Sequence, residues 1–369
     1  PPIAAVPPAA TSAQPPAIAA QPQTNPSALA PTAPAVSSPT GASPASPPSV
    51  QDLIVQAKQA IGPQPSAASD FPGAIKLLEE AIAKEPNNST VLGLLAQYTQ
   101  LNGMVLMQRG AEEAVYGQFQ KSGEYFRRLR EVGQPLDETM IKLASQILYN
   151  EACVFAKQQK TDKAVASLSE AFDAGWADIP HVDKDTDFDS IRETPEFKAL
   201  REQAPARILA AAKEHAKTLL AAHQPFDFKF ELPDLEGKTI SLADFKGKVL
   251  IVDVWGTWCP PCRMEIPHFV ELHKKYREAG LEIIGVNYER VPEEKVNETI
   301  KKFVEDNGLT YSCVIGDQAT QTMIPEFSGF PTTLFIDRTG KVRLKVVGYH
   351  PLPSLEGIVS TLLAEKGSA

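Results

Sequence analysis

The chain has 369 residues and a formal net charge of −9. This length is too great for one ordinary small domain. No basic stripe supports nucleic-acid binding. No stretch of about 18 apolar residues is present, so we expect no membrane span. Four cysteines are too few for a secreted scaffold that is held together by disulfides.

The first fifty residues differ in composition from the rest of the chain. They carry no charged side chain and hold 14 of the 32 prolines. With so few large apolar groups, this segment cannot offset the entropy of ordering. We predict a disordered Pro/Ala-rich linker over residues 1–50. The start at Pro1, without Met, is consistent with removal of an upstream signal peptide or anchor.

Residues 51–224 are predicted to form an all-α domain. Small residues at 74 and 81, an apolar residue at 78 and a proline at 86 resemble the second helix of a tetratricopeptide repeat (TPR). A second match runs over residues 149–171. The segment 90–132 departs from the repeat pattern, which favours longer helices. We expect a TPR-like helical domain, closed by a capping extension over 178–200 and a helix over 206–223.

Residues 225–369 are predicted to form an α/β domain with a mixed central sheet flanked by helices, because strand-like and helical patterns alternate there. The expected helices cover 263–278, 293–307 and 352–365. The expected strands cover 226–232, 238–242, 249–255, 281–287, 311–315, 332–337 and 342–347, and the first two form a hairpin.

Two cysteines separated by two residues follow the strand 249–255 and open the next helix. This spacing at a strand-to-helix turn is typical of a thiol–disulfide oxidoreductase. Cys259 is predicted to lie exposed at the helix N-terminus, where unpaired N–H groups and the helix dipole favour a thiolate. Cys262, one turn further on, is close enough to resolve a mixed disulfide. Cys259 is therefore the predicted nucleophile and Cys262 the resolving thiol.

Four motifs in order carry a resemblance to the thioredoxin superfamily, most closely to its exported TlpA/ResA-like thiol–disulfide oxidoreductases. They are Leu242–Gly247, Trp255–Cys262, Gly329–Thr333 and Gly348. The resemblance implies a cis-proline at Pro331 and a Phe330 backbone that is free to pair with a substrate peptide. It implies that Gly348 lets a substrate backbone come close. Trp258 would flank the nucleophile, and Trp258, Pro260 and Pro261 would line the substrate site.

Two acidic residues are candidates for proton transfer. Asp253 lies six residues before Cys259, where the resemblance implies a buried acid. Burial would raise its pKa, so that it could accept the Cys262 proton as a general base. Glu265 matches an acid of the ResA-like group and would share this task, although a position on a solvated helix face is an equal alternative. Arg263 and His268 are expected at the surface.

The remaining cysteines, Cys153 and Cys313, fall in apolar patterns and are expected to be small core residues. A zinc site has little support, since no second Cys-x-x-Cys is present. No metal, flavin or nicotinamide cofactor is expected.

The sequence therefore favours a reductase of protein disulfides in an extracytoplasmic compartment, periplasmic or envelope-associated. A partner protein would supply its electrons, and the helical domain would recruit a peptide or protein. Two alternatives stay open. A peroxiredoxin-like peroxidase is disfavoured because Gly256 occupies the place where peroxiredoxins set Thr. The other is a TPR-type adaptor with a secondary redox domain.

Overall fold

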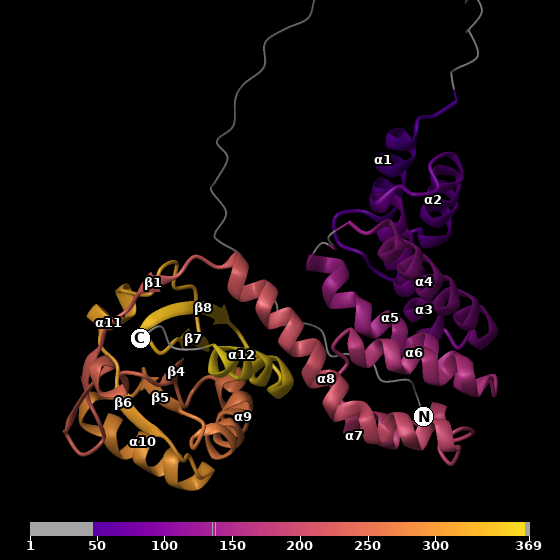
Figure 1. Cartoon of the computed structure of the whole chain (residues 1–369). Helices are drawn as coiled ribbons and strands as arrows, with labels where there is room; N and C mark the ends of the chain where they lie inside the picture. The colour runs from indigo at the N-terminus through magenta and orange to yellow at the C-terminus, as the bar shows by residue number, and fades with distance from the viewer. Residues whose placement is uncertain (1–46, 135, 137, 366–369) are drawn as a thin grey trace, which may run out of the picture.

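The computed structural model describes residues 47–134, 136 and 138–365, so almost all of the predicted linker over residues 1–50 lies outside the described residues. A helical region is followed by an α/β region, and the long helix α8 (Pro195–Ala222) lies between them (Figure 1). In the described part of the chain, no helix is both long and apolar enough to cross a bilayer.

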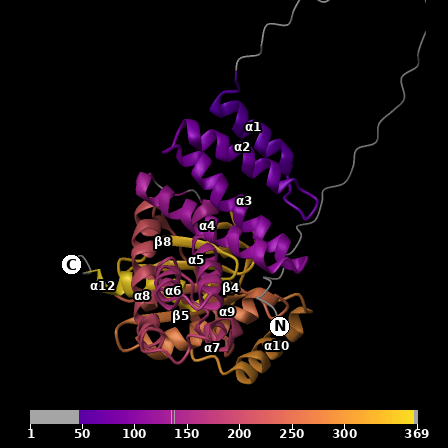
Figure 2. The ribbon, with the colours of Figure 1, turned by 90° about the vertical axis from the view of Figure 1, so that its right-hand side faces the viewer.

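The helical region consists of consecutive helices that pack against their neighbours in the chain. In Figure 2, where the helical region faces the viewer, it lies in front of the sheet. Its elements are α1 (Val50–Ile61), α2 (Phe71–Lys84), α3 (Ser89–Gln108), α4 (Glu112–Val132), α5 (Glu138–Lys157), α6 (Thr161–Asp173), α7 (Ile179–Lys184) and the short 3₁₀ helix η1 (Thr186–Phe188). The all-α prediction is confirmed, including the long helices α3 and α4.

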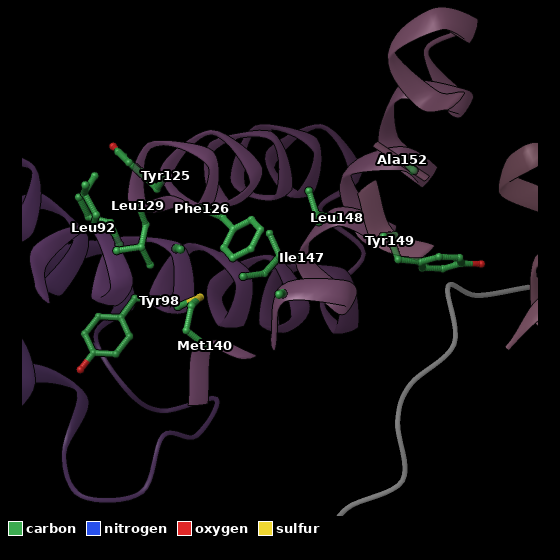
Figure 3. Packing of buried hydrophobic residues seen from close by; sticks show 14 of the residues in the cluster. Leu92, Tyr98, Tyr125, Phe126, Leu129, Met140, Ile147, Leu148, Tyr149 and Ala152 are labelled. Atoms are coloured by element: carbon green, nitrogen blue, oxygen red, sulfur yellow. The ribbon is translucent and has the colours of Figure 1, made fainter. Parts of the chain in front are cut away.

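Small and large side chains alternate in the core of this region. Ala74 and Ala81 on α2, and Ala164 and Ala171 on α6, are fully buried, which lets paired helices approach closely. Larger side chains of α3, α4 and α5 fill the space between the helices, and Phe126 of α4 lies beside Ile147 of α5 (Figure 3). The arrangement agrees with stacked helical pairs, and the assignment to TPR repeats stays a prediction.

The α/β region is a thioredoxin-like mixed sheet flanked by helices. Its six-stranded sheet has the order β1-β8-β7-β4-β5-β6, in which β4, β5 and β6 are parallel and the other neighbouring pairs are antiparallel. The elements are β1 (Phe226–Asp227), β2 (Glu231–Pro233), β3 (Thr239–Ser241), η2 (Leu242–Phe245), β4 (Val249–Trp255), α9 (Pro260–Tyr276), β5 (Leu281–Asn287), α10 (Glu293–Asn307), β6 (Ser312–Ile315), α11 (Gln318–Thr322), β7 (Thr332–Ile336), β8 (Lys341–Val347) and α12 (Leu352–Ala364).

Two predicted elements differ from the structure, and one helix of the structure was not predicted. The predicted strand 226–232 is divided, because Phe226–Asp227 pairs with β8 while Glu231–Pro233 pairs with β3. Helix α11 was not predicted. The helix predicted over 206–223 is the second half of α8, which continues through Pro205. An interior proline costs about 3 kcal/mol, and Ala204 and Ile208, on either side of Pro205, hold this part of the helix in the hydrophobic core.

Helix α8 belongs to two hydrophobic cores. Phe197 and Leu200 near its start pack in the core of the helical region. Ala216 and Leu220 near its end pack with α9, α12 and one face of the sheet. The domain boundary at residue 225 stays a prediction. The helix that precedes it packs at its start in the core of the helical region and at its end in the core of the α/β region.

We expect Gly357→Ala to destabilise the protein by about 1–3 kcal/mol, because overpacking forces neighbouring groups apart. A Cβ at Gly357 of α12 would lie 2.6 Å from the carbonyl carbon of Ala212 in α8. The control is Gly93→Ala in α3, whose added methyl would meet only Leu129 at 3.8 Å. This control should be neutral or stabilising by up to about 1 kcal/mol. Urea unfolding measures both, and equal stability of the two variants would contradict the close α8–α12 packing.

Candidate redox site

The site is a disulfide at the N-terminus of α9. Strand β4 ends at Trp255, and a short turn leads to Cys259, which is the N-cap residue of α9. Cys259 and Cys262 are joined by a disulfide bond. The Cys262 backbone N–H donates to the Cys259 sulfur over 3.3 Å. The first turn of the helix therefore directs an unpaired backbone donor at the sulfur of the predicted nucleophile.

The expectation that Cys259 is exposed is wrong for this oxidised form. Cys259 is 2% exposed and Cys262 is 1% exposed. Both belong to the hydrophobic core between α9 and the sheet, and the half-buried Trp258 and Phe330 pack against that core. Pro260, which follows Cys259, is exposed, and Pro261 is half-buried. The disulfide therefore lies just below the surface, with aromatic side chains around it.

Trp258 is held between two loops. Its indole N–H donates to the Tyr288 carbonyl over 2.8 Å. Its ring meets the Phe330 ring edge-on, with centroids 5.2 Å apart. The guanidinium carbon of Arg290 lies 3.3 Å from the centre of the Trp258 ring. The indole is thus fixed beside the disulfide. Trp255, by contrast, is fully buried in the core.

The predicted cis-proline is present in the loop that leads into β7. The Phe330–Pro331 peptide bond is cis. The Gly348 N–H donates to the Pro331 carbonyl over 2.8 Å. Gly348 has a φ of +86°, a conformation that favours glycine. Among the residues that the structure describes, none hydrogen-bonds to the Phe330 backbone. This backbone is therefore available to an incoming peptide.

Both acidic candidates are buried behind the disulfide. Asp253 on β4 is 1% exposed, and its Oδ1 atom has no hydrogen-bond partner among the described residues. Burial raises its pKa well above the ordinary value, and the nearby Glu265 charge raises it further. Burial likewise raises the pKa of Glu265 to about 7. Glu265 is fully buried, so the solvated-face alternative for this residue is wrong.

His350, in the loop between β8 and α12, contacts Glu265, a connection that the sequence did not reveal. Its backbone N–H donates to Glu265 Oε1 over 2.8 Å. Its ring Nδ1 lies 2.9 Å from the Gly348 carbonyl oxygen. His350 is 85 positions from Glu265, and only the fold brings them together. Of the two residues expected at the surface, Arg263 is exposed and His268 is half-buried beside Tyr349.

Cys153 and Cys313 are buried free thiols, as expected of core residues. In the described part of the chain, one group of side chains has the spacing of metal ligands: Cys153, Asp185 and Asp187 in the helical region. Asp185 already accepts hydrogen bonds from the Tyr149 hydroxyl, at 2.6 Å, and from the Asp187 N–H, at 3.0 Å. Lys157 lies 3.4 Å from Asp187. These contacts describe a buried polar network.

The α/β region is similar to known proteins. Residues 225–345 match the AhpC/TSA family. A thiol-disulfide oxidoreductase ResA of Bacillus cereus is 37% identical over 134 residues, which cover 36% of this chain and 74% of the relative. A ResA of Geobacillus thermodenitrificans is 41% identical over 119 residues, covering 32% of this chain and 66% of the relative. The crystal structure of a thiol:disulfide interchange protein from Chlorobium tepidum is 27% identical, with a TM-score of 0.35, and covers 38% of this chain and 99% of its own.

A thioredoxin-like sheet with a redox disulfide at a helix N-terminus, opposite a cis-proline, defines a thiol–disulfide oxidoreductase. The similarity to the Bacillus protein covers most of that relative's length. The chain belongs to the ResA family of thiol–disulfide oxidoreductases.

Proposed function

We propose that this protein reduces disulfides of client proteins with the Cys259–Cys262 dithiol, in an extracytoplasmic compartment. The observation that carries the proposal is the disulfide at the N-terminus of α9, next to the free backbone of Phe330 and the cis-proline. The structure holds the oxidised form, which is the product of one reaction cycle. A redox partner protein would return it to the dithiol.

In the forward reaction, the Cys259 thiolate attacks one sulfur of the client disulfide. The client S–S bond breaks, a Cys259–client mixed disulfide forms, and the other client sulfur leaves as a thiolate that takes up a proton. Cys262 then loses its proton and attacks the Cys259 sulfur. The Cys259–Cys262 bond forms and the second client sulfur leaves as a thiolate, which is protonated in turn. Two electrons pass from the protein to the client. Of the two protons that the client thiolates take up, one balances the proton lost by Cys262 and the other comes from the solvent, which received the Cys259 proton when the thiolate formed.

The buried carboxylates are the proposed acceptors of the Cys262 proton. A general base works best when its pKa lies near the operating pH, and the pKa of Glu265 is raised to about 7. Asp253 lies on the same face of the sheet as Trp255, beneath α9, and its pKa is raised by burial. We assign proton acceptance to this coupled pair of acids.

The client would dock on the surface around the disulfide. Three large, well-exposed hydrophobic side chains of the described structure lie close to the site in the chain or in the fold. They are Met264, at 60%, just after Cys262, and Val347 and Tyr349, at 42% and 41%, on either side of Gly348. Exposed apolar groups that gather in one place commonly mark an interaction site. The Phe330 backbone would pair with an extended client segment, and Gly348 would leave room for it.

The helical region would recruit a client or another envelope protein, since stacked helical pairs offer extended surfaces for binding. It shares α8 with the redox region, so a bound partner would be held near the disulfide. The linker before residue 51 would tether the protein to its compartment.

The test uses the full chain in an insulin-reduction assay with dithiothreitol. The protein should accelerate insulin precipitation over dithiothreitol alone. The AhpC/TSA match is compatible with the peroxidase alternative. Peroxide consumption under the same conditions tests this alternative. Rapid peroxide consumption with no effect on insulin would replace the proposed function with the alternative.

A further inference from the structure

The loop that follows β5 is clamped to the redox loop. The Glu289 carboxylate accepts hydrogen bonds from the Thr257 N–H and the Thr257 hydroxyl, both over 2.9 Å. On the same loop, the Tyr288 carbonyl accepts the indole N–H of Trp258. These contacts fix residues 288–290 relative to the two residues that precede Cys259. A side chain on this loop therefore has a defined position at the rim of the site.

Arg290 is placed at this rim with its hydrogen-bonding groups unused. Its guanidinium lies against the Trp258 ring, with its central carbon 3.3 Å from the ring centre. Stacking of this kind holds the guanidinium plane through its face and leaves the N–H groups at its edges free. The residue is exposed. Within the described part of the chain, no carboxylate pairs with it.

Two exposed guanidinium groups near the disulfide have no carboxylate partner among the described residues. One is Arg290, and the other is Arg263, directly after Cys262. Glu289, next to Arg290 in the chain, directs its carboxylate to Thr257 and Asn287 instead, and Glu265 is buried against the His350 N–H. Both guanidinium groups can therefore pair with a carboxylate of a bound client.

We propose that Arg290 is a specificity-determining residue that receives the carboxylate of an Asp or Glu next to the client's disulfide. The guanidinium edge presents a planar fork of N–H donors that matches the two oxygens of a carboxylate. This inference rests on the proposed reduction of protein disulfides, and it defines the preferred client as a disulfide-containing segment with an acidic residue close to its cysteine.

The experiment measures how fast the reduced full-length protein reduces three synthetic peptides with an internal disulfide. The peptides differ only in the residue before the first cysteine, which is Asp, Asn or Lys. At low salt the Asp peptide should react about 2- to 5-fold faster than the Asn peptide, the range expected for one exposed charge pair. The preference should fade at about 0.5 M salt. Arg290→Gln should abolish the preference, so that the Asp and Asn peptides react at the same rate.

The matched control is Arg277→Gln, which removes an exposed arginine at the far end of α9 and should keep the preference. Arg290→Glu should reverse it in favour of the Lys peptide. The inference is overturned if Arg290→Gln retains the preference, or if it slows all three peptides equally, as a role confined to holding Trp258 would require. Equal reduction of all three by the wild type refutes the inference alone, whereas no reduction of any peptide refutes the proposed function.

Discussion

Cys259→Ser is expected to abolish insulin reduction, with a loss on the order of 10³-fold or more, because a neutral hydroxyl cannot replace the attacking thiolate. Cys262→Ser should also lose turnover, but for a different reason. Its nucleophile remains, so it should react once and stay joined to the client in a mixed disulfide. The two variants therefore separate the attacking sulfur from the resolving sulfur, which sit at the N-cap and in the first turn of α9.

The measurement is the mass of the protein after incubation of each reduced variant with insulin. Cys262→Ser should carry an adduct that dithiothreitol releases, and Cys259→Ser should carry none. The control is Cys153→Ser, which removes a buried thiol of the helical region and should keep full activity. An adduct on Cys259→Ser in place of Cys262→Ser would exchange the two roles.

Glu265→Gln is expected to remove about 2–3 kcal/mol of the pH dependence of stability between pH 5 and pH 8. The pKa of Glu265 is raised to about 7 in the folded protein, from an ordinary value of 4.5. The native state therefore holds this proton more tightly than the unfolded state does. Its stabilising effect is complete below about pH 4.5 and is lost as the pH rises through 7. The glutamine keeps an oxygen that can accept the His350 N–H and carries no charge.

Urea unfolding of the oxidised protein at several pH values provides the measurement. The wild type should lose more stability than Glu265→Gln as the pH rises, so the two curves converge at low pH and separate at high pH. Glu271→Gln, which removes an exposed carboxylate from the same helix, reports the effect of losing one charge. Parallel curves for the wild type and Glu265→Gln would contradict the raised pKa.

The sequence predicted the elements whose signal is local. The apolar runs of β4 and β5 and the pattern of α10 gave the same bounds that the structure shows. The cysteine pair lies at the predicted strand-to-helix turn, where the structure has the Cys259–Cys262 disulfide. The peptide bond at Pro331 was expected to be cis because of a resemblance, and the structure confirms it.

The features that the sequence missed depend on contacts between distant segments. Helical spacing placed Glu265 on α9, but its burial depends on the backbone at His350, far along the chain. Arg290 carried no motif, and its position follows from the clamp between the β5 loop and Thr257. The burial of Cys259 follows from packing by Trp258 and Phe330, which local helix geometry does not describe.

Helix α8, which both regions share, fixes the distance between the two parts of the molecule. At 28 residues it spans about 42 Å, and its two ends are anchored in separate cores. Any reorientation of one part against the other must bend α8 or detach one of its ends from the core in which it packs. If the helical region binds a client as proposed, the fixed spacing requires the client's cysteines to lie at a matching distance from the bound segment.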